Sequence, residues 1–155
     1  MSHIHYKALL LAATLTLAAT PALAGDNAVV KHRKSVMTGI GAAMGATVCQ
    51  LKGQCNMKPK VLLRQAKTLA FLSSISADSF RQATPNATMK TTSTDNVWSD
   101  WAEFDKGLNT MTKRARNLVK VVKAGADKAA LGKAVGKLGK TCKGCHDNFR
   151  KKKKK

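Results

Sequence analysis

Apolar residues recur every three or four positions along most of the chain after residue 25, which is the spacing of one buried face of a helix. The first such run spans residues 25 to 51, and the sequence Lys52-Gly53-Gln54 interrupts it. Pro59 suits the first turn of a second helix, which the pattern extends to about Ala77. The inward positions of these two helices are Val30, Met37, Ile40, Met44 and Leu51, then Leu62, Ala66, Leu69, Leu72 and Ile75.

Residues 79 to 95 are rich in Thr, Ser and Asn and predict a long loop within one domain. Asp95 suits the N-cap of a third helix, Gly125 ends that helix, and Asp127 caps a fourth. In both helices the apolar spacing alternates between four and three, as in the core of a helix bundle. These positions are Val97, Trp101, Phe104, Leu108, Met111, Ala115, Leu118 and Val122, then Leu131, Val135, Leu138, Cys142, Cys145 and Phe149.

The first 24 residues have the features of a signal peptide. An unbroken small and apolar run from Ala8 to Ala19 is followed by Ala22-Leu23-Ala24, a small-residue cleavage pattern. A buried N-terminal helix is the alternative, and the run is too short to span a bilayer. We therefore expect three parts: a signal peptide (1–24), a helical domain (25–150) and a lysine tail (151–155), with the mature protein exported to a bacterial periplasm.

The charge of the chain is strongly positive. The whole sequence has 28 Lys and Arg against 8 Asp and Glu, and removal of the signal peptide takes away Lys7 only, which leaves a formal charge of +19. Such an excess predicts anionic partners, either acidic redox proteins or an anionic membrane surface.

The sequence Cys142-Lys143-Gly144-Cys145-His146 carries the clearest chemistry. Two cysteines with this spacing can hold a haem by two thioether bonds, and the following histidine can ligate its iron. A redox dithiol would need βαβ patterning, and a zinc site would need a second Cys/His pair; the chain offers neither. The motif predicts one covalently attached haem c, held by Cys142 and Cys145 with His146 as the iron ligand, and together with export it argues against a nucleic-acid partner.

Arg33 lies on the same face of the first helix as Met37, one turn before it. A charge directed toward a core needs a partner, and the haem propionates could supply one. The alternative is that Arg33 lies at the edge of the face and reaches solvent.

The chain resembles the class II cytochromes c, the family of cytochrome c′ and cytochrome c-556. The resemblance rests on the C-terminal haem motif, on Arg33-Lys34-Ser35-Val36-Met37, on Lys52-Gly53-Gln54 and on Val97-Trp98-Ser99-Asp100, and it covers the mature chain. It implies an all-α, antiparallel up-down-up-down four-helix bundle. It also implies that Arg33 lies by the haem propionates, that Met37 lies over the distal face, and that a homodimer can form.

The function then depends on the sixth position of the iron. If Met37 ligates, the protein is an electron carrier with His146/Met37 ligation, the interpretation favoured by the c-556-like appearance of the first and third helices. If Met37 only packs there, the iron is five-coordinate and binds nitric oxide or carbon monoxide, as in cytochrome c′. The sequence offers no acid, base or substrate pocket, so we do not expect an enzyme.

Cys49 and Cys55 are additional to the haem pair. They lie six residues apart across a glycine-containing break, in a chain expected to be exported to an oxidising compartment. We expect a disulfide between them; two free buried thiols are the alternative.

Overall fold

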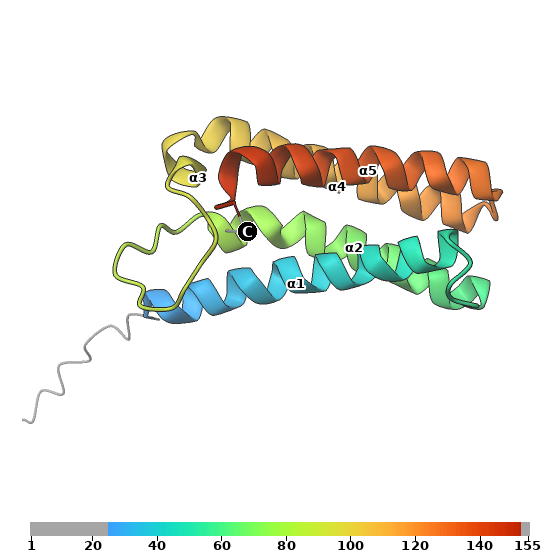
Figure 1. Cartoon of the computed structure of the whole chain (residues 1–155), viewed down its shortest axis with the longest axis horizontal. Coiled ribbons are helices and arrows are strands. Elements are labelled where there is room, and N and C mark those ends of the chain that lie inside the picture. The colour runs from blue at the N-terminus through green and yellow to red at the C-terminus, as the bar shows by residue number, and fades with distance from the viewer. Residues whose placement is uncertain (1–24, 153–155) are drawn as a thin grey trace, which may run out of the picture.

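Four long helices make up most of the computed structural model, which describes residues 25–152 (Figure 1). They are α1 (Asp26–Leu51), α2 (Pro59–Phe80), α4 (Trp101–Lys123) and α5 (Lys128–Phe149), and the single turn α3 (Asn96–Ser99) directly precedes α4. Consecutive long helices run in opposite directions (Figure 1), which confirms the all-α, up-down-up-down four-helix bundle. The predicted signal peptide and residues 153–155 lie outside the described residues.

The helix ends follow the local sequence. Gly53 and Gly125 have φ angles of 72° and 64°, a left-handed conformation that favours glycine, and they end α1 and α4. Asp127 caps α5 as predicted, since its carboxylate accepts a hydrogen bond of 2.8 Å from the Ala130 amide. The third predicted helix differs from expectation, because Asp100 has a non-helical conformation (φ −124°, ψ 51°) that separates α3 from α4.

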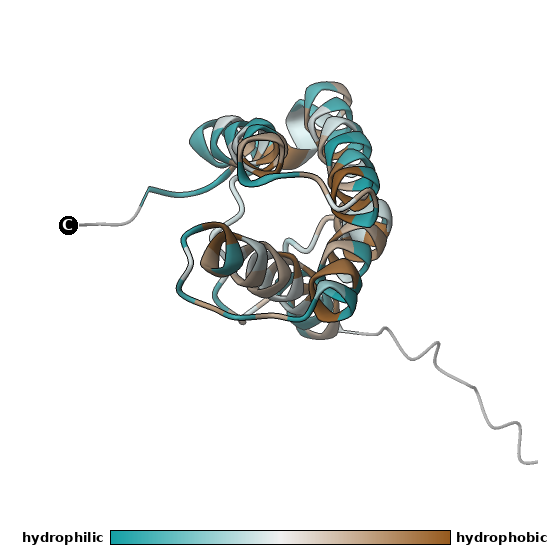
Figure 2. Ribbon diagram, turned by 90° about the vertical axis from the view of Figure 1, so that its right-hand side faces the viewer, coloured by the Kyte–Doolittle hydropathy of each residue, from teal (hydrophilic) through white to brown (hydrophobic). Residues whose placement is uncertain are grey.

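The buried positions of α4 and α5 are largely those predicted. Phe104, Leu108, Met111, Ala115 and Leu118 of α4 are buried, as are Leu131, Val135, Leu138 and Phe149 of α5. The rings of Phe80 and Phe149 each lie 5.0 Å from that of Phe104, edge to face. Figure 2, turned by 90° from Figure 1, shows these long helices arranged around a common interior.

In α1 and α2 the deepest positions differ from the predicted ones. The most buried residues of α1 are Val30, Arg33, Val36, Ile40, Ala43 and Thr47, whereas Met37 and Met44 are only half-buried. In α2, Ser73, Ser76 and Ser79 are buried more deeply than Leu72 and Ile75. The Ser76 and Ser79 hydroxyls donate to the carbonyls of Ser73 and Ser76, both at 2.7 Å, so their hydrogen bonds are made within α2. A prediction from hydropathy therefore places these two serines at the surface although they are buried.

The expected disulfide is present. Cys49 and Cys55 are bonded, with their Cα atoms 5.4 Å apart, so the end of α1 is joined to the loop that leads into α2. Within residues 25–152, no helix combines the length and the apolar character needed to cross a bilayer.

Candidate haem site

A cavity of about 550 Å³ lies toward the end of the bundle where α5 finishes. Its volume is in the range of cofactor sites. All five residues singled out from the sequence line it: Arg33, Met37, Cys142, Cys145 and His146. Arg33 and Met37 are on α1, whereas the other three are on α5, more than a hundred positions later in the chain. These two helices have few other contacts with each other.

The last turns of α5 place the haem motif on the cavity wall. Cys145 and His146 follow Cys142 by three and four positions, so a helix presents all three on one side. Upstream, Arg114 of α4 donates to the Lys137 carbonyl and to the Thr141 hydroxyl, which fixes the turn directly before Cys142. The residues therefore fit a haem held covalently from α5.

The two cysteines are half-buried and are not joined in a disulfide. Burial raises the pKa of the Cys142 thiol, and burial together with Cys142 raises the pKa of Cys145 to about 11. A redox dithiol needs a thiolate of lowered pKa, so this pair has the wrong environment for that chemistry. Among residues 25–152, no three His, Cys, Asp or Glu side chains come together as metal ligands.

His146 is exposed at the cavity wall, near Arg150. Partial burial and the positive charge of Arg150 lower its pKa, against the opposing effect of Asp147. Asp147 is paired with Lys143, one turn earlier on α5. The environment therefore favours the neutral imidazole, the form that ligates iron.

Arg33 is 1% exposed, so the alternative in which it reaches solvent is wrong. Its Nε donates to the Ser79 carbonyl at 3.2 Å, Nη2 to the Gln82 carbonyl at 3.0 Å and Nη1 to the Thr84 hydroxyl at 3.4 Å. Burial lowers its pKa, while Asp26 acts in the opposite direction. A guanidinium has more N–H donors than these three bonds use, and Arg33 lines the cavity, so it keeps donors that a haem propionate can accept from.

Two aromatic rings enclose the same guanidinium. Its Cζ lies 4.9 Å from the centre of the Phe80 ring and 5.0 Å from that of Trp98, within cation–π range. The Trp98 indole N–H donates to the Phe80 carbonyl at 2.9 Å, which fixes the second ring. No sequence pattern predicts this enclosure, because Phe80 and Trp98 lie on either side of a loop whose path does not follow from hydrophobic periodicity.

Met37 lines the cavity, but it is not the only thioether there. Met44 from α1 and Met111 from α4 line it too, together with Ile40, Leu108 and Val97. The family resemblance places Met37 alone over the haem, whereas the apolar spacing assigns Met44 and Met111 to the core. The wall contributed by α1 and α4 is thus predominantly apolar.

The loop between α2 and α3 covers one end of the cavity, and the sequence did not predict its path. On the α1 side, Asp26 accepts from the Asn86 amide at 2.8 Å and Asn27 accepts from the Met89 amide at 2.7 Å. On the α5 side, the Thr94 amide donates to the Phe149 carbonyl at 3.0 Å. The loop therefore ties α1 to α5 beside the cavity, and Thr91, Thr92 and Ser93 of this loop line it.

Comparison with known proteins agrees with this site. A protein-family model described as cytochrome C′ matches residues 28–150. Cytochrome c′ of Pararhodospirillum photometricum is 33% identical over 127 residues, which cover 82% of this chain and 99% of that protein. Cytochrome c′ of Halomonas halodenitrificans is 28% identical over 124 residues, 78% of this chain and 94% of that protein.

Solved structures show the same similarity. The crystal structure of cytochrome c′ from Rubrivivax gelatinosus superposes with a TM-score of 0.74 at 28% identity and covers 82% of this chain and 98% of its own. A ferrous arginine-to-lysine variant of cytochrome c′ from Alcaligenes xylosoxidans, with bound nitric oxide, also has a TM-score of 0.74 at 28% identity, covering 84% and 98%.

Proposed function

Because this chain belongs to the cytochrome c′ family, it carries a covalently attached haem c, and we propose that it is an exported, five-coordinate haem protein that binds nitric oxide or carbon monoxide. The His146/Met37 electron carrier favoured by the sequence has less support. Several similar structures from Alcaligenes xylosoxidans are nitric oxide complexes of cytochrome c′, which favours gas binding.

The apolar wall of the cavity is the observation that carries this proposal. Met37, Ile40, Met44, Leu108 and Met111 line it and offer no hydrogen-bond donor to a bound water or anion. An uncharged diatomic gas loses little hydration on entering such a space, whereas an ion loses much more. The wall therefore selects for small neutral ligands.

The chain's own residues divide the work at this site. Cys142 and Cys145 would hold the haem as thioethers, His146 would ligate the iron with its neutral imidazole, and Arg33 would donate to a propionate. The haem iron supplies the coordination position for the gas. Methionine is common core filler, and with three methionines on the wall no single thioether is set apart as an iron ligand.

The experiment is an absorption and electron paramagnetic resonance study of the holoprotein with and without carbon monoxide and nitric oxide. We expect high-spin spectra in both oxidation states and gas binding without displacement of a protein ligand. A low-spin ferric spectrum with the charge-transfer band of a methionine–iron bond would contradict the proposal and restore Met37 as a ligand.

A homodimer is part of the same proposal. Between Ser35 and Ala46, α1 has no charged residue, although the protein is strongly cationic, and Ser35, Ala42 and Gly45 are exposed there without lining the cavity. A second copy can approach this face without charge repulsion. Sedimentation equilibrium of the holoprotein at moderate salt should give twice the monomer mass, and a monomer at all concentrations would contradict it.

A further inference from the structure

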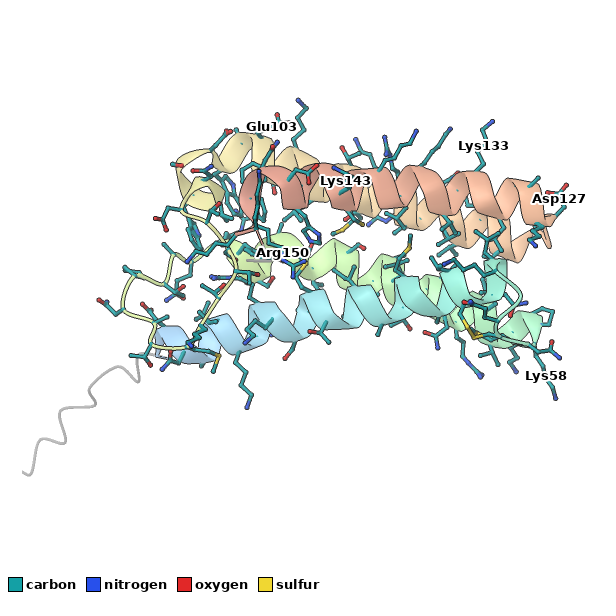
Figure 3. The ribbon with its side chains drawn as sticks, in the orientation of Figure 1. Lys58, Glu103, Asp127, Lys133, Lys143 and Arg150 are labelled. Atoms are coloured by element: carbon teal, nitrogen blue, oxygen red, sulfur yellow. A yellow bond between two sulfur atoms is a disulfide. The ribbon has the colours of Figure 1, made fainter. Side chains whose placement is uncertain are left out.

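Acidic residues are concentrated at the end of the bundle that holds the cavity. The chain has 8 Asp and Glu, and only Asp127 lies at the opposite end, beside the turn from α4 to α5. Figure 3 shows Glu103 toward one end and Asp127 and Lys58 at the other. The acids at the cavity end are Asp26, Asp78, Asp95, Asp100, Glu103, Asp105 and Asp147.

The opposite end, which we call the haem-remote end, is strongly cationic. It comprises the α1–α2 loop, the α4–α5 turn and the helix termini that they join, and its cations are all exposed. They are Lys52, Lys58, Lys60, Arg64, Lys120, Lys123, Lys128 and Lys133.

Nothing in the described part of the chain neutralises these cations. The ion pairs among residues 25–152 are Arg81–Asp78, Lys106–Glu103 and Lys143–Asp147, and none involves the haem-remote end. Asp127, the single acid there, accepts a hydrogen bond from the Ala130 amide as a helix cap. The positive charge of this end is thus available to an external anion.

The backbone that carries these cations is held in place. The disulfide between Cys49 and Cys55 closes the loop that bears Lys52 and leads to Lys58. The Met57 amide donates to the Gln50 side chain at 2.8 Å, which adds a second tie across the same loop. The loop therefore presents its charges from an ordered backbone, with a smaller entropic cost on binding.

The same end has no large apolar residue that could anchor a protein partner. Within residues 25–152, Phe71 is the one large hydrophobic side chain that is strongly exposed, and it lies in the middle of α2. Protein interfaces usually depend on buried aromatic anchors, so this end lacks what a specific protein partner would use. A broad, polar, cationic surface fits an anionic lipid surface, where each Lys or Arg close to the headgroups strengthens binding.

We propose that the haem-remote end binds the anionic phospholipid surface of a membrane and that the cavity is thereby directed away from the lipid. Lys128 and His146 are both on α5 and are about 27 Å apart along the helix axis, given the rise per residue. This distance is well beyond the Debye length of about 8 Å at physiological ionic strength, so lipid contact leaves gas binding unchanged. The inference is independent of which ligand the iron takes.

Sedimentation of the holoprotein with phospholipid vesicles tests this inference. At low salt we expect binding to vesicles with about 30 mol % phosphatidylglycerol, and none to pure phosphatidylcholine, because the attraction is electrostatic. One variant neutralises four cations of the haem-remote end: Lys52→Gln, Lys58→Gln, Lys123→Gln and Lys128→Gln. The control removes the same charge near the cavity end: Lys31→Gln, Lys90→Gln, Lys151→Gln and Lys152→Gln.

The haem-remote variant should bind at least about a hundredfold more weakly, and the control only a few-fold more weakly. The carbon monoxide spectra of both variants should match the wild type, which shows that each is folded. Equal losses in the two variants would overturn the inference, because net charge alone would then explain the binding. Absence of vesicle binding would also overturn it, as would binding of polyglutamate or duplex DNA through this end in place of vesicles.

Discussion

Arg33 combines full burial, three hydrogen bonds and two aromatic contacts in one side chain. Replacement by methionine keeps much of its volume but leaves the Ser79 and Gln82 carbonyls without their donor. We expect Arg33→Met to lower the free energy of unfolding by about 2 to 4 kcal/mol. Urea unfolding of the holoprotein measures this loss.

Arg33→Lys is the matched variant, because it keeps the charge but lacks the planar fork that reaches several acceptors. The free energy of unfolding of Arg33→Lys should fall between that of the wild type and that of Arg33→Met. Wild-type stability in both variants would show that these contacts contribute nothing measurable.

The role of Met37 distinguishes the two candidate functions, gas binding at a five-coordinate haem and electron transfer with His146/Met37 ligation. If it only packs over the site, Met37→Ala enlarges the apolar space without changing the spin state, and carbon monoxide should bind about tenfold more tightly, an effect of about 1.4 kcal/mol. Titration of the ferrous holoprotein, followed by absorption, measures this affinity.

Met44→Ala serves as the control, since Met44 is a second half-buried methionine on the same helix and in the same cavity. A conversion from low spin to high spin in Met37→Ala, and not in Met44→Ala, would identify Met37 as the iron ligand and contradict the proposed function.

Among the helices and loops, the Cys49–Cys55 disulfide joins the end of α1 only to the loop that follows it. It closes a loop of six residues, which limits its stabilisation to about 2 to 3 kcal/mol in the chain-entropy account. The double variant Cys49→Ala/Cys55→Ala should melt a few degrees lower, as measured by circular dichroism. Its haem spectrum should be unchanged because the disulfide lies at the haem-remote end; an altered spectrum would show that the staple also shapes the cavity.

The helix boundaries could be predicted where a single residue determines the backbone. Gly53 and Gly125 adopt positive φ after α1 and α4, and Pro59 lies in the first turn of α2. Asp127 caps α5 with its side chain. The seams of α4 and α5 could be predicted for a similar reason, because each of these helices buries one stripe of large apolar side chains.

The remaining features depend on contacts that no local pattern encodes. Ser73, Ser76 and Ser79 are buried because α2 packs closely against both α1 and α4, where small side chains fit. The path of the α2–α3 loop depends on hydrogen bonds from Asp26 and Asn27, about sixty positions away in the chain. The haem motif could be predicted because the attachment of a haem depends on the local spacing of two cysteines and a histidine. The enclosure of Arg33 depends on residues that come together only when the chain folds.

For the whole molecule, the two ends of the bundle have different electrostatic roles. The haem-remote end carries unpaired cations that are held on an ordered backbone, whereas the acids and the cavity share the other end. The lysine tail also belongs to the cavity end, because the Lys151 amide donates to the Thr92 carbonyl at 2.7 Å. The tail therefore starts beside the haem site, at the end opposite the surface that we assign to lipid.

This placement determines how the tail should be tested. Deletion should begin at Lys152, since removal of Lys151 would also break the hydrogen bond to the loop that covers the cavity. We expect deletion of residues 152–155 to slow reduction of the haem by an acidic protein donor at low salt, because adjacent like charges remain solvated and steer the encounter. Stopped-flow absorption over a salt series measures this rate, and the difference from the wild type should vanish at high salt. The melting temperature should be nearly unchanged and vesicle binding should fall by less than in the haem-remote variant; equal reduction rates at low salt would rule out steering by the tail.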